Sequence, residues 1–395
     1  MQTRITEQYR QWPGSEQAED IIRHCVHCGF CNATCPTYQL TGNELDGPRG
    51  RIYQIKQILE GQAVTPSAYL HLDRCLECRN CETTCPSGVA YGSLLPFGKR
   101  LVATQQGKVS RLFKWLLTQF LAYPRRLGPF LRLGQWLKPI MPAVIRQKIP
   151  SRLRVPSPTL AVQARKMLLL DGCVQNLMTP ATNVQLRNVF NRLGISLDSA
   201  TGCCAGLHQH LGQEAAALQQ MKNNIDHWLG LLDQGYERLV SSASGCGVTI
   251  RHYPEYLAHD ADYLDKAKRL AAHTDDVSEV LSREDLSVLN KDRGSQTVAF
   301  HPPCTLQHGL KLNGVVEQIL TAAGYQLQTI RNAHLCCGSA GPYSVLHPRI
   351  SLQLVQNKWQ DIGAVDLLVT ANVGCELHLS AANSSVEVKH WISCL

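Results

Sequence analysis

The sequence of 395 residues predicts an α+β multidomain protein, in which a helical N-terminal domain precedes two cysteine-rich α/β units. Two internal repeats predict this division. Four cysteines and a proline recur after 50 residues: Cys25, Cys28, Cys31, Cys35 and Pro36 return as Cys75, Cys78, Cys81, Cys85 and Pro86. A second set recurs after about 130 residues: Cys173, Cys203, Cys204 and Cys246 return as Cys304, Cys336, Cys337 and Cys375. We therefore expect a helical domain over 1–100, a basic amphipathic connector over 101–165, and cysteine-rich units over 166–290 and 291–395.

The first hundred residues are typical of short helices. Ser15 is a candidate N-cap, and apolar residues continue at helical spacing to Arg23. Further helices are predicted at about 49–60 and 67–74, between the two cysteine runs. Residues 101–165 are basic and aromatic and are interrupted by prolines, which predicts short amphipathic helices and then a linker. These prolines are Pro124, Pro129, Pro139, Pro142, Pro150, Pro156 and Pro158.

From about residue 166 the pattern becomes α/β. Apolar runs at 167–170 and 297–300 each lead into a cysteine, and helical stretches follow at about 181–193 and 314–323. Later apolar strands at 238–240 and 366–370 precede Cys246 and Cys375. Strands that alternate with helices predict largely parallel sheets, and the functional loops of such sheets follow the carboxyl ends of their strands. The cysteines of both units fall in those loops.

Composition excludes several classes of protein. Hydrophobic residues make up 44% and charged residues 18%, which is typical of a globular protein and not of a disordered or fibrous one. The cysteine count of 17 is odd, and the first residues lack the apolar stretch of a signal peptide, so we expect reduced thiols and a cytoplasmic protein. No apolar run reaches the roughly 18 residues of a membrane-spanning helix.

The net charge of +8 is concentrated in one segment. Between Glu82 and Asp171 the chain has no carboxylate side chain and has 15 of its 39 Lys and Arg residues. The rest of the chain carries 24 basic against 31 acidic residues. A nucleic-acid-binding function for the whole chain is therefore not favoured.

The first repeat has the spacing of a bacterial two-cluster ferredoxin. In Cys-x2-Cys-x2-Cys-x3-Cys-Pro, three thiolates bind one 4Fe-4S cluster and the fourth binds the other. This rule assigns Cys25, Cys28, Cys31 and Cys85 to one cluster, and Cys75, Cys78, Cys81 and Cys35 to the other. Zinc is the alternative, but zinc sites usually assemble two separated pairs of ligands.

The cysteine-rich units predict a possible third iron-sulfur centre, with Cys304, Cys336, Cys337 and Cys375 as its ligands. Adjacent cysteines are poorly placed to bind one ion but can reach two irons of a cluster, and the alternative is that these are buried structural thiols. We expect the nearby histidines, His208, His210, His301, His308 and His334, to be structural, and Cys394, which has no counterpart in the repeats, to be a thiol that binds no metal.

Motifs for dinucleotide, acyl or phosphoryl chemistry are absent from the sequence, since it has no Gly-x-Gly-x-x-Gly after a strand, no P-loop and no Gly-x-Ser-x-Gly. The chain is thus expected to have no catalytic residues of its own and to carry electrons for the active site of another subunit.

Six segments together resemble the iron-sulfur subunits of bacterial glycolate oxidase (glycolate dehydrogenase), over nearly the whole chain: residues 25–38, 45–52, 81–88, 304–308, 335–341 and 370–375. The cysteine-rich half also resembles the cysteine-rich subunit of heterodisulfide reductase and the third subunit of anaerobic glycerol-3-phosphate dehydrogenase. Ala205 replaces the glycine of Cys-Cys-Gly, and Thr249 and His378 replace the last cysteine of the heterodisulfide reductase motif. The eight ferredoxin cysteines show no such difference.

The resemblance implies a complex in which FAD-binding glycolate oxidase subunits oxidise glycolate to glyoxylate. This chain would pass the electrons singly from FAD toward a quinone, through two 4Fe-4S clusters and any further iron-sulfur centre. The alternatives are the equivalent subunit of a lactate or glycerol-3-phosphate dehydrogenase, and an iron-sulfur sensor without turnover.

The basic segment mixes cations with apolar and aromatic residues, as interfacial helices do. The residues are 114–117, Phe120, Arg125, Arg126, Phe130, Arg132, Trp136 and Lys138. We expect peripheral contact with the cytoplasmic face of the inner membrane, and the alternative is docking on an acidic flavoprotein subunit.

Overall fold

The N-terminal part of the computed structural model is helical, as predicted, and the structure describes residues 1–140, 160–289 and 296–395. Pro36, Pro48 and Pro66 each begin a helix, at a position where a missing N–H costs nothing. The helices from the N-terminus are α1 Glu7–Arg10, α2 Ser15–His24, α3 Phe30–Ala33, α4 Pro36–Thr41, η1 Glu44–Asp46, α5 Pro48–Leu59, α6 Pro66–Asp73, α7 Asn80–Thr84, α8 Tyr91–Val102 and η2 Ala103–Gln105.

The predictions for the helices near 15–23, 49–60 and 67–74 are confirmed, but the predicted N-cap is wrong. Gly14 is the N-cap, with φ of 87°, and Ser15 is already helical. The Ser15 hydroxyl donates instead to the backbone carbonyl of Tyr9 at 2.6 Å, which connects α2 to α1.

Each cysteine-rich unit contains a four-stranded parallel sheet, and the two sheets have the same strand order. The first sheet has the order β2-β1-β3-β4 and the second β6-β5-β7-β8. The strands are β1 Arg165–Gly172, β2 Ile195–Gly202, β3 Leu239–Ser241, β4 Thr274–Asp276, β5 Val298–His301, β6 Leu327–Gln328, β7 Leu367–Thr370 and β8 Glu387–His390. Four of these were predicted, namely β1, β3, β5 and β7, and they are the central strands.

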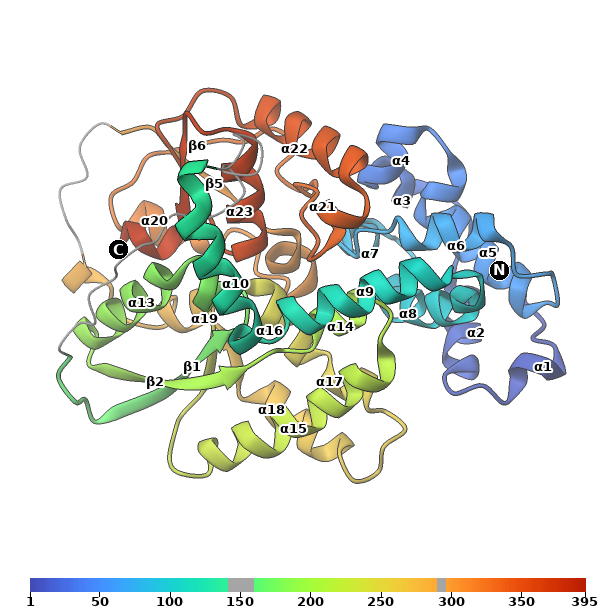
Figure 1. The fold of residues 1–395 in the computed structure, drawn as a ribbon, viewed down its shortest axis with the longest axis horizontal. Coiled ribbons are helices and arrows are strands. Elements are labelled where there is room, and N and C mark those ends of the chain that lie inside the picture. The colour runs from blue at the N-terminus through green and yellow to red at the C-terminus, as the bar shows by residue number, and fades with distance from the viewer. Residues whose placement is uncertain (141–159, 290–295) are drawn as a thin grey trace.

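Helices cover both sheets and complete the α/β architecture (Figure 1). In the first unit they are α12 Gln175–Met178, α13 Pro180–Arg192, α14 Gly206–His210, α15 Glu214–Leu232, α16 Ser244–Arg251, α17 Tyr253–Tyr256, α18 Leu264–Ala272, α19 Val277–Leu281 and η4 Ser287–Leu289. In the second they are η5 Thr305–Gly309, α20 Val315–Ala322, α21 Tyr343–Leu346, α22 Pro348–Ile362, α23 Val373–Ala382 and η6 Trp391–Cys394.

In each unit the strand order places the cysteines beyond the carboxyl ends of the central strands. The chain reverses its direction of strand addition between β1 and β3, and between β5 and β7, and ligand sites of open α/β sheets lie at such points. Cys173 directly follows β1, and Cys304 lies three residues after the end of β5. Cys246 and Cys375 lie in the first turns of α16 and α23, after β3 and β7. One apolar core joins the two units, with Leu169 and Val240 of the first and Phe300 and Trp391 of the second.

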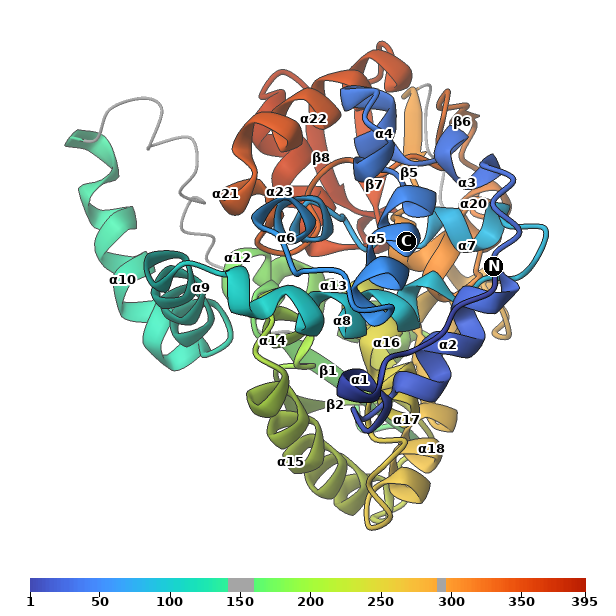
Figure 2. The same cartoon turned by 90° about the vertical axis from the view of Figure 1, so that its right-hand side faces the viewer.

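The basic connector forms two amphipathic helices, α9 Lys108–Leu121 and α10 Pro124–Leu137, followed by η3 Lys138–Ile140. Figure 2 shows that α10 projects away from the body of the protein. Pro129 does not end α10 as predicted, because the carbonyl that it leaves without a helical partner belongs to Arg125, which is exposed to water. The predicted linker over 141–159 lies outside the described residues, and so do residues 290–295, where we placed the boundary between the two units. No helix of the described residues is long and apolar enough to cross a bilayer.

Candidate metal centres

Cys25, Cys28, Cys31 and Cys85 line one cavity of about 30 Å³, at whose edge Cys81 also lies. The chain can bend around this cavity because His27 and Gly29 adopt left-handed backbone conformations, with φ of 61° and 84°. A β-carbon at position 29 would also lie 2.8 Å from a terminal nitrogen of the Arg49 side chain, so a larger residue there would have to displace that side chain.

Cys35, Cys75, Cys78 and Cys81 line a second cavity, of about 100 Å³. Its loop repeats the first one, since Glu77 and Arg79 take the positions of His27 and Gly29 with φ of 55° and 57°. The fourth cysteine of each run, Cys35 or Cys85, therefore lines the cavity of the other run. The structure thus brings the eight cysteines together in the two crossed groups expected from their spacing.

The separation of the sulfurs distinguishes a cluster from a single ion. A tetrahedral ion with Zn–S bonds of about 2.3 Å needs its sulfurs roughly 3.8 Å apart. In the part of the chain that the structure describes, no three of the eight ferredoxin sulfurs lie within 4.8 Å of one another. Four thiols around a shared cavity, of which no three come so close together, suit a 4Fe-4S cube better than a single zinc ion.

Burial keeps the unligated thiols neutral. It raises the pKa of Cys31 to about 11 and raises the pKa values of Cys78 and Cys81 well above their usual range. Thiolates therefore require nearby positive charge, which bound iron and cationic side chains can supply.

Arg51 is the cation buried closest to the second cavity. Its side chain is 1% exposed, and its Nη1 lies 4.0 Å from the Cys35 sulfur. Its Nε donates to the carbonyl of His71 at 2.8 Å, and Nη2 donates to Thr37. The buried carboxylate of Asp46 lies 3.8 Å from Arg51 and also pairs with His71 and Arg74. Desolvation opposes the charge, but the thiols, Tyr91 and Asp46 raise the pKa of Arg51, so its cation persists.

The four thiols of the first cysteine-rich unit also meet. Cys203 contacts Cys173 and Cys204, and Cys204 contacts Cys246. Ala205, where the resembling proteins have glycine, adopts φ of 68°, close to the 89° of Gly338 in the second unit. The substitution therefore keeps the left-handed turn that the Cys-Cys pair requires, at the cost of backbone strain.

The four thiols of the second unit contact one another in series. The sulfurs of Cys304 and Cys336 are 3.9 Å apart, Cys336 contacts Cys337, and Cys337 contacts Cys375. Leu76 of the helical domain and Tyr343 of the second unit belong to one apolar cluster, and Cys78 and Cys304 both pack against it. The second ferredoxin cavity is thus adjacent to this unit.

The histidines named from the sequence lie in three different environments. His210, His308 and His334 lie at the contact with the helical domain. His210 pairs with Glu77 at 3.0 Å, and His308 contacts the Thr83 hydroxyl at 2.9 Å and the His334 carbonyl at 3.0 Å. His208 is buried beside Tyr123. His301 differs, because a ring nitrogen lies within 4.8 Å of the sulfurs of Cys337 and Cys375.

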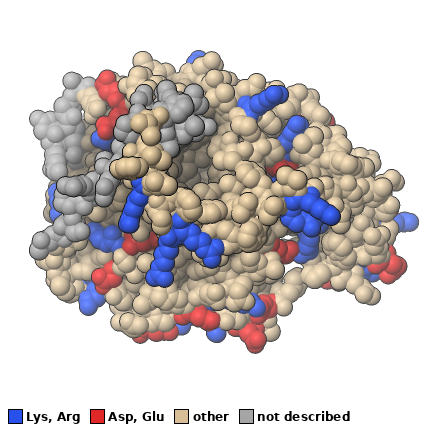
Figure 3. All heavy atoms as spheres, in the orientation of Figure 1, with Lys and Arg blue, Asp and Glu red and all other residues tan. Residues whose placement is uncertain are grey.

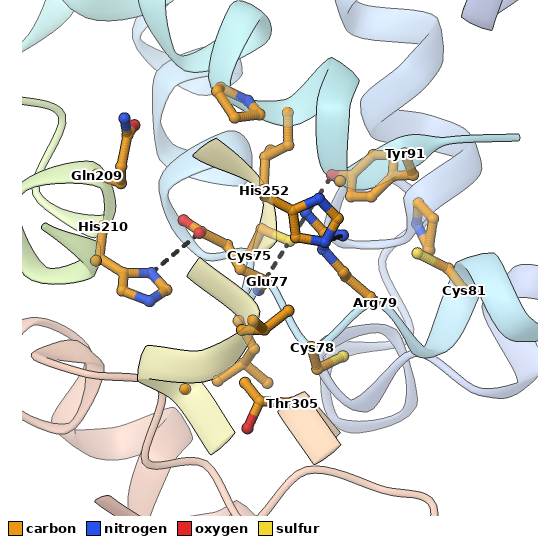
Figure 4. Close-up of a pocket in the computed structure, with 18 of the residues that line it drawn as sticks. Cys75, Glu77, Cys78, Arg79, Cys81, Tyr91, Gln209, His210, His252 and Thr305 are labelled. Carbon is orange, nitrogen blue, oxygen red and sulfur yellow. Dashed lines mark hydrogen bonds and ion pairs between the residues drawn. The ribbon is translucent and has the colours of Figure 1, made fainter. Parts of the chain in front are cut away.

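Two further side chains were not found from the sequence. Lys358 is 1% exposed and donates to the Asn332 carbonyl at 2.8 Å, and burial lowers its pKa while the thiols of the second unit oppose that change. Arg79 contacts His252 across the boundary with the first unit (Figure 4). The sequence signal for Arg79 was a charged residue between Cys78 and Cys81 where the first repeat has Gly29, and Lys358, 21 residues after Cys337, had no such signal.

His378 and Cys394 have other environments. His378 contacts the Ser351 hydroxyl at 3.0 Å. Cys394 is buried in the apolar core shared by the two units, and its surroundings are those of a structural residue.

Comparison with known proteins finds the same order of one ferredoxin-type domain followed by two cysteine-rich domains. The 4Fe-4S dicluster domain family matches residues 21–89, and the Cysteine-rich domain family matches residues 167–251 and 298–380. The glycolate oxidase iron-sulfur subunit of Escherichia coli (strain K12) is 44% identical over 99% of this chain and 98% of its own length.

Two more distant relatives are informative. The probable glycolate oxidase iron-sulfur subunit of Bacillus subtilis (strain 168) is 26% identical over 91% of this chain and 89% of its own length. Lactate utilization protein A of Bacillus subtilis (strain 168) is 27% identical over 57% of this chain and 96% of its own length.

Proposed function

Because the chain belongs to the family of glycolate oxidase iron-sulfur subunits, we propose that it carries electrons from a flavin on a partner subunit toward a quinone. Oxidation of glycolate to glyoxylate releases two electrons and two protons, and the partner's flavin accepts the electron pair. A 4Fe-4S cluster takes up and releases one electron at a time, which is the chemistry needed between a flavin and its acceptor.

The two crossed groups of cysteines are the observation that carries this proposal. Cys25, Cys28, Cys31 and Cys85 would hold one cluster, and Cys75, Cys78, Cys81 and Cys35 the other. Cys304, Cys336, Cys337 and Cys375 would hold a further iron-sulfur centre. The packing of Cys78 beside Cys304 supports a path from the second cluster to that centre.

Electrons would enter through the first cluster. Cys28 is exposed, and so are Val26 in the same loop, at 66%, and Phe30, the first residue of α3, at 62%. Exposed apolar side chains around a redox centre are typical of a docking surface for a partner. The second cavity lies between the helical domain and the cysteine-rich units, since residues such as His210, His252 and Thr305 also line it.

We further propose that α9 and α10 hold the subunit against the anionic surface of the inner membrane, on its cytoplasmic face. Lys114 fixes α9 to the body through Asp73 at 2.6 Å and through the Tyr69 hydroxyl. Phe120 of α9 and Phe130 of α10 contact each other edge to face, with ring centroids 5.3 Å apart. Large apolar side chains on these two helices are nevertheless exposed to solvent: Val109, Leu112, Phe113, Trp115, Leu116, Phe120, Phe130, Leu133 and Trp136.

Basic residues accompany this apolar surface. Arg125, Arg126 and Arg132 of α10 are exposed, and Figure 3 shows Lys and Arg side chains over the face that α9 and α10 present. Each cation near an anionic leaflet contributes about 1 kcal/mol. Binding to vesicles with anionic lipid, weakened by salt and by Arg125→Glu with Arg126→Glu, is the expected result. Equal binding to neutral and anionic vesicles, or binding to neither, would favour docking on a flavoprotein instead.

The test of the function is reconstitution with a flavoprotein. The chain, coexpressed with its FAD-binding partner, should support dye reduction that depends on glycolate, and Cys78→Ser should abolish it. Dye reduction with lactate or glycerol 3-phosphate and not with glycolate would assign the chain to one of those dehydrogenases. Absence of turnover with all three substrates would favour a sensor.

A further inference from the structure

Among the residues that the structure describes, His301 is a buried histidine whose ring has no hydrogen-bond partner. It ends β5, three residues before Cys304, and it is 1% exposed. Over the described residues, neither ring nitrogen of His301 has a partner. A buried polar atom without a partner costs about 1–3 kcal/mol, so an imidazole with two such atoms indicates a ligand that is not a protein group.

The sulfurs around His301 are suited to bind that ligand. A ring nitrogen of His301 and the sulfurs of Cys337 and Cys375 all lie within 4.8 Å of one another. Elsewhere in the described chain, no other three His, Cys, Asp or Glu side chains meet so closely. This spacing suits three ligands of one metal atom, whereas the Cys304 and Cys336 sulfurs, 3.9 Å apart, suit a neighbouring atom.

The first cysteine-rich unit serves as an internal comparison. It has the same four cysteines, but Leu170 stands three residues before Cys173, where the second unit has His301. Counted from the Cys-Cys pair, the residue at the position of Lys358 is Ile225. The imidazole and the buried ammonium therefore occur together in one unit, and both are absent at the matching positions of the other.

We propose that the second cysteine-rich unit binds an iron-sulfur centre of mixed ligation, in which His301, Cys337 and Cys375 hold one iron and Cys304 and Cys336 hold its neighbour. The inference rests on the proposed function, since it adds a nitrogen ligand to the further centre. Lys358 offsets the charge of the thiolates. A neutral imidazole in place of a thiolate makes a centre less anionic and raises its reduction potential, as it does in Rieske centres. Electrons that leave the second cluster beside Cys78 would therefore be drawn to this unit.

The test is spectroscopic and uses the full chain, purified anaerobically after labelling of its histidines with ¹⁵N. Iron, sulfide and zinc are counted per chain, and pulsed EPR of the reduced protein detects nitrogen bound to iron. More than eight irons and a strong ¹⁵N coupling are expected. His301→Leu, which copies the first unit, should abolish the coupling. His378→Ala should retain it, because His378 is bonded to Ser351.

His301→Cys keeps a ligand at this position and guards against a simple folding defect. It should retain more than eight irons, lose the nitrogen coupling and lower the potential of the centre. A coupling that persists in His301→Leu would overturn the proposal, as would its absence from the unmodified protein. One zinc per chain with only eight irons would also overturn it.

These results are separable from the function itself. If glycolate reduces the ferredoxin clusters through the flavoprotein but no nitrogen coupling is found, only the mixed-ligation centre is wrong. If the coupling is present but glycolate fails to reduce any cluster, the centre stands and the glycolate function is wrong.

Discussion

Replacing Arg51 with methionine should lower the reduction potential of the cluster proposed at Cys35, Cys75, Cys78 and Cys81. Arg51 is buried, and its Nη1 lies 4.0 Å from the Cys35 sulfur. An added electron spreads over the whole cluster, so a mean separation of roughly 7 Å from the guanidinium is appropriate, and at an effective dielectric constant of about 20 the attraction is about 2.4 kcal/mol. At about 59 mV per 1.36 kcal/mol, loss of this attraction corresponds to about 100 mV.

The assay is a redox titration of the purified chain monitored by EPR. Arg51→Met should shift the potential of one cluster down by about 100 mV and leave the other nearly unchanged, because Arg51 contacts Cys35 directly. Arg51→Lys keeps the charge and should shift it far less. Arg74→Met is the matched control, since Arg74 also pairs with Asp46, at 3.3 Å, but is partly exposed.

Removal of Arg51 leaves the buried negative charge of Asp46 less well neutralised, which destabilises the fold. The double variant Arg51→Met with Asp46→Asn removes both charges and so separates a loss of stability from a change in the cluster's electrostatic environment. It should restore stability and still show a lowered potential, though by less than the single variant. A potential in Arg51→Met within about 20 mV of the unmodified protein, far below the Coulomb estimate, would refute the reasoning.

Four further outcomes are expected. Cys28→Ser and Cys78→Ser should each lose iron and electron transfer while the α/β half stays folded, and unchanged iron and sulfide in both variants would contradict the ligand assignment. Cys337→Ser should lower the iron content and alter the spectrum, whereas Cys394→Ala should do neither. A preparation with eight irons, whose spectrum Cys337→Ser leaves unchanged, would show that the thiols of the second unit are structural only. Gly50→Ala should destabilise the helical domain by about 1–3 kcal/mol or more, because a β-carbon there would lie 2.1 Å from the Glu44 carbonyl oxygen. Gly230→Ala, with open space around it, should instead raise the free energy of unfolding in urea by about 0.5–1 kcal/mol. Burial opposes ionisation of Asp73, but its pairing with His347 and Lys114 holds its pKa well below the usual range. This pairing therefore stabilises the fold above about pH 4, and the stabilisation is lost as the pH falls through the lowered pKa. Asp73→Asn should flatten this acid dependence of the melting temperature.

The sequence predicted the central strands and missed the edges of both sheets. β1, β3, β5 and β7 are apolar runs buried within the sheets, which sequence patterns detect well. The edge strand β4 has the sequence Thr-Asp-Asp, and β6 has only two residues. Polar side chains in a buried strand find partners elsewhere in the fold, such as Arg251 and Arg283 for Asp275, and a local pattern contains no information about them.

The same limit applies to the metal centres. The spacing of the cysteines is local and therefore visible in the sequence, and it predicted both crossed groups. Arg51, Lys358 and His301 act through contacts between elements that are far apart in the chain. His301 was expected to be structural because a lone histidine usually is, and only the folded chain shows that it lies beside two sulfurs with both nitrogens unpaired.

Anaerobic addition of glycolate to the coexpressed complex, followed by EPR and absorbance, tests the central claim most directly. Glycolate should reduce the flavin first and then the clusters of this chain, and Cys28→Ser should leave the flavin reduced while the second cluster remains oxidised. Full reduction of the flavin by glycolate with every cluster of the unmodified chain still oxidised would contradict the account.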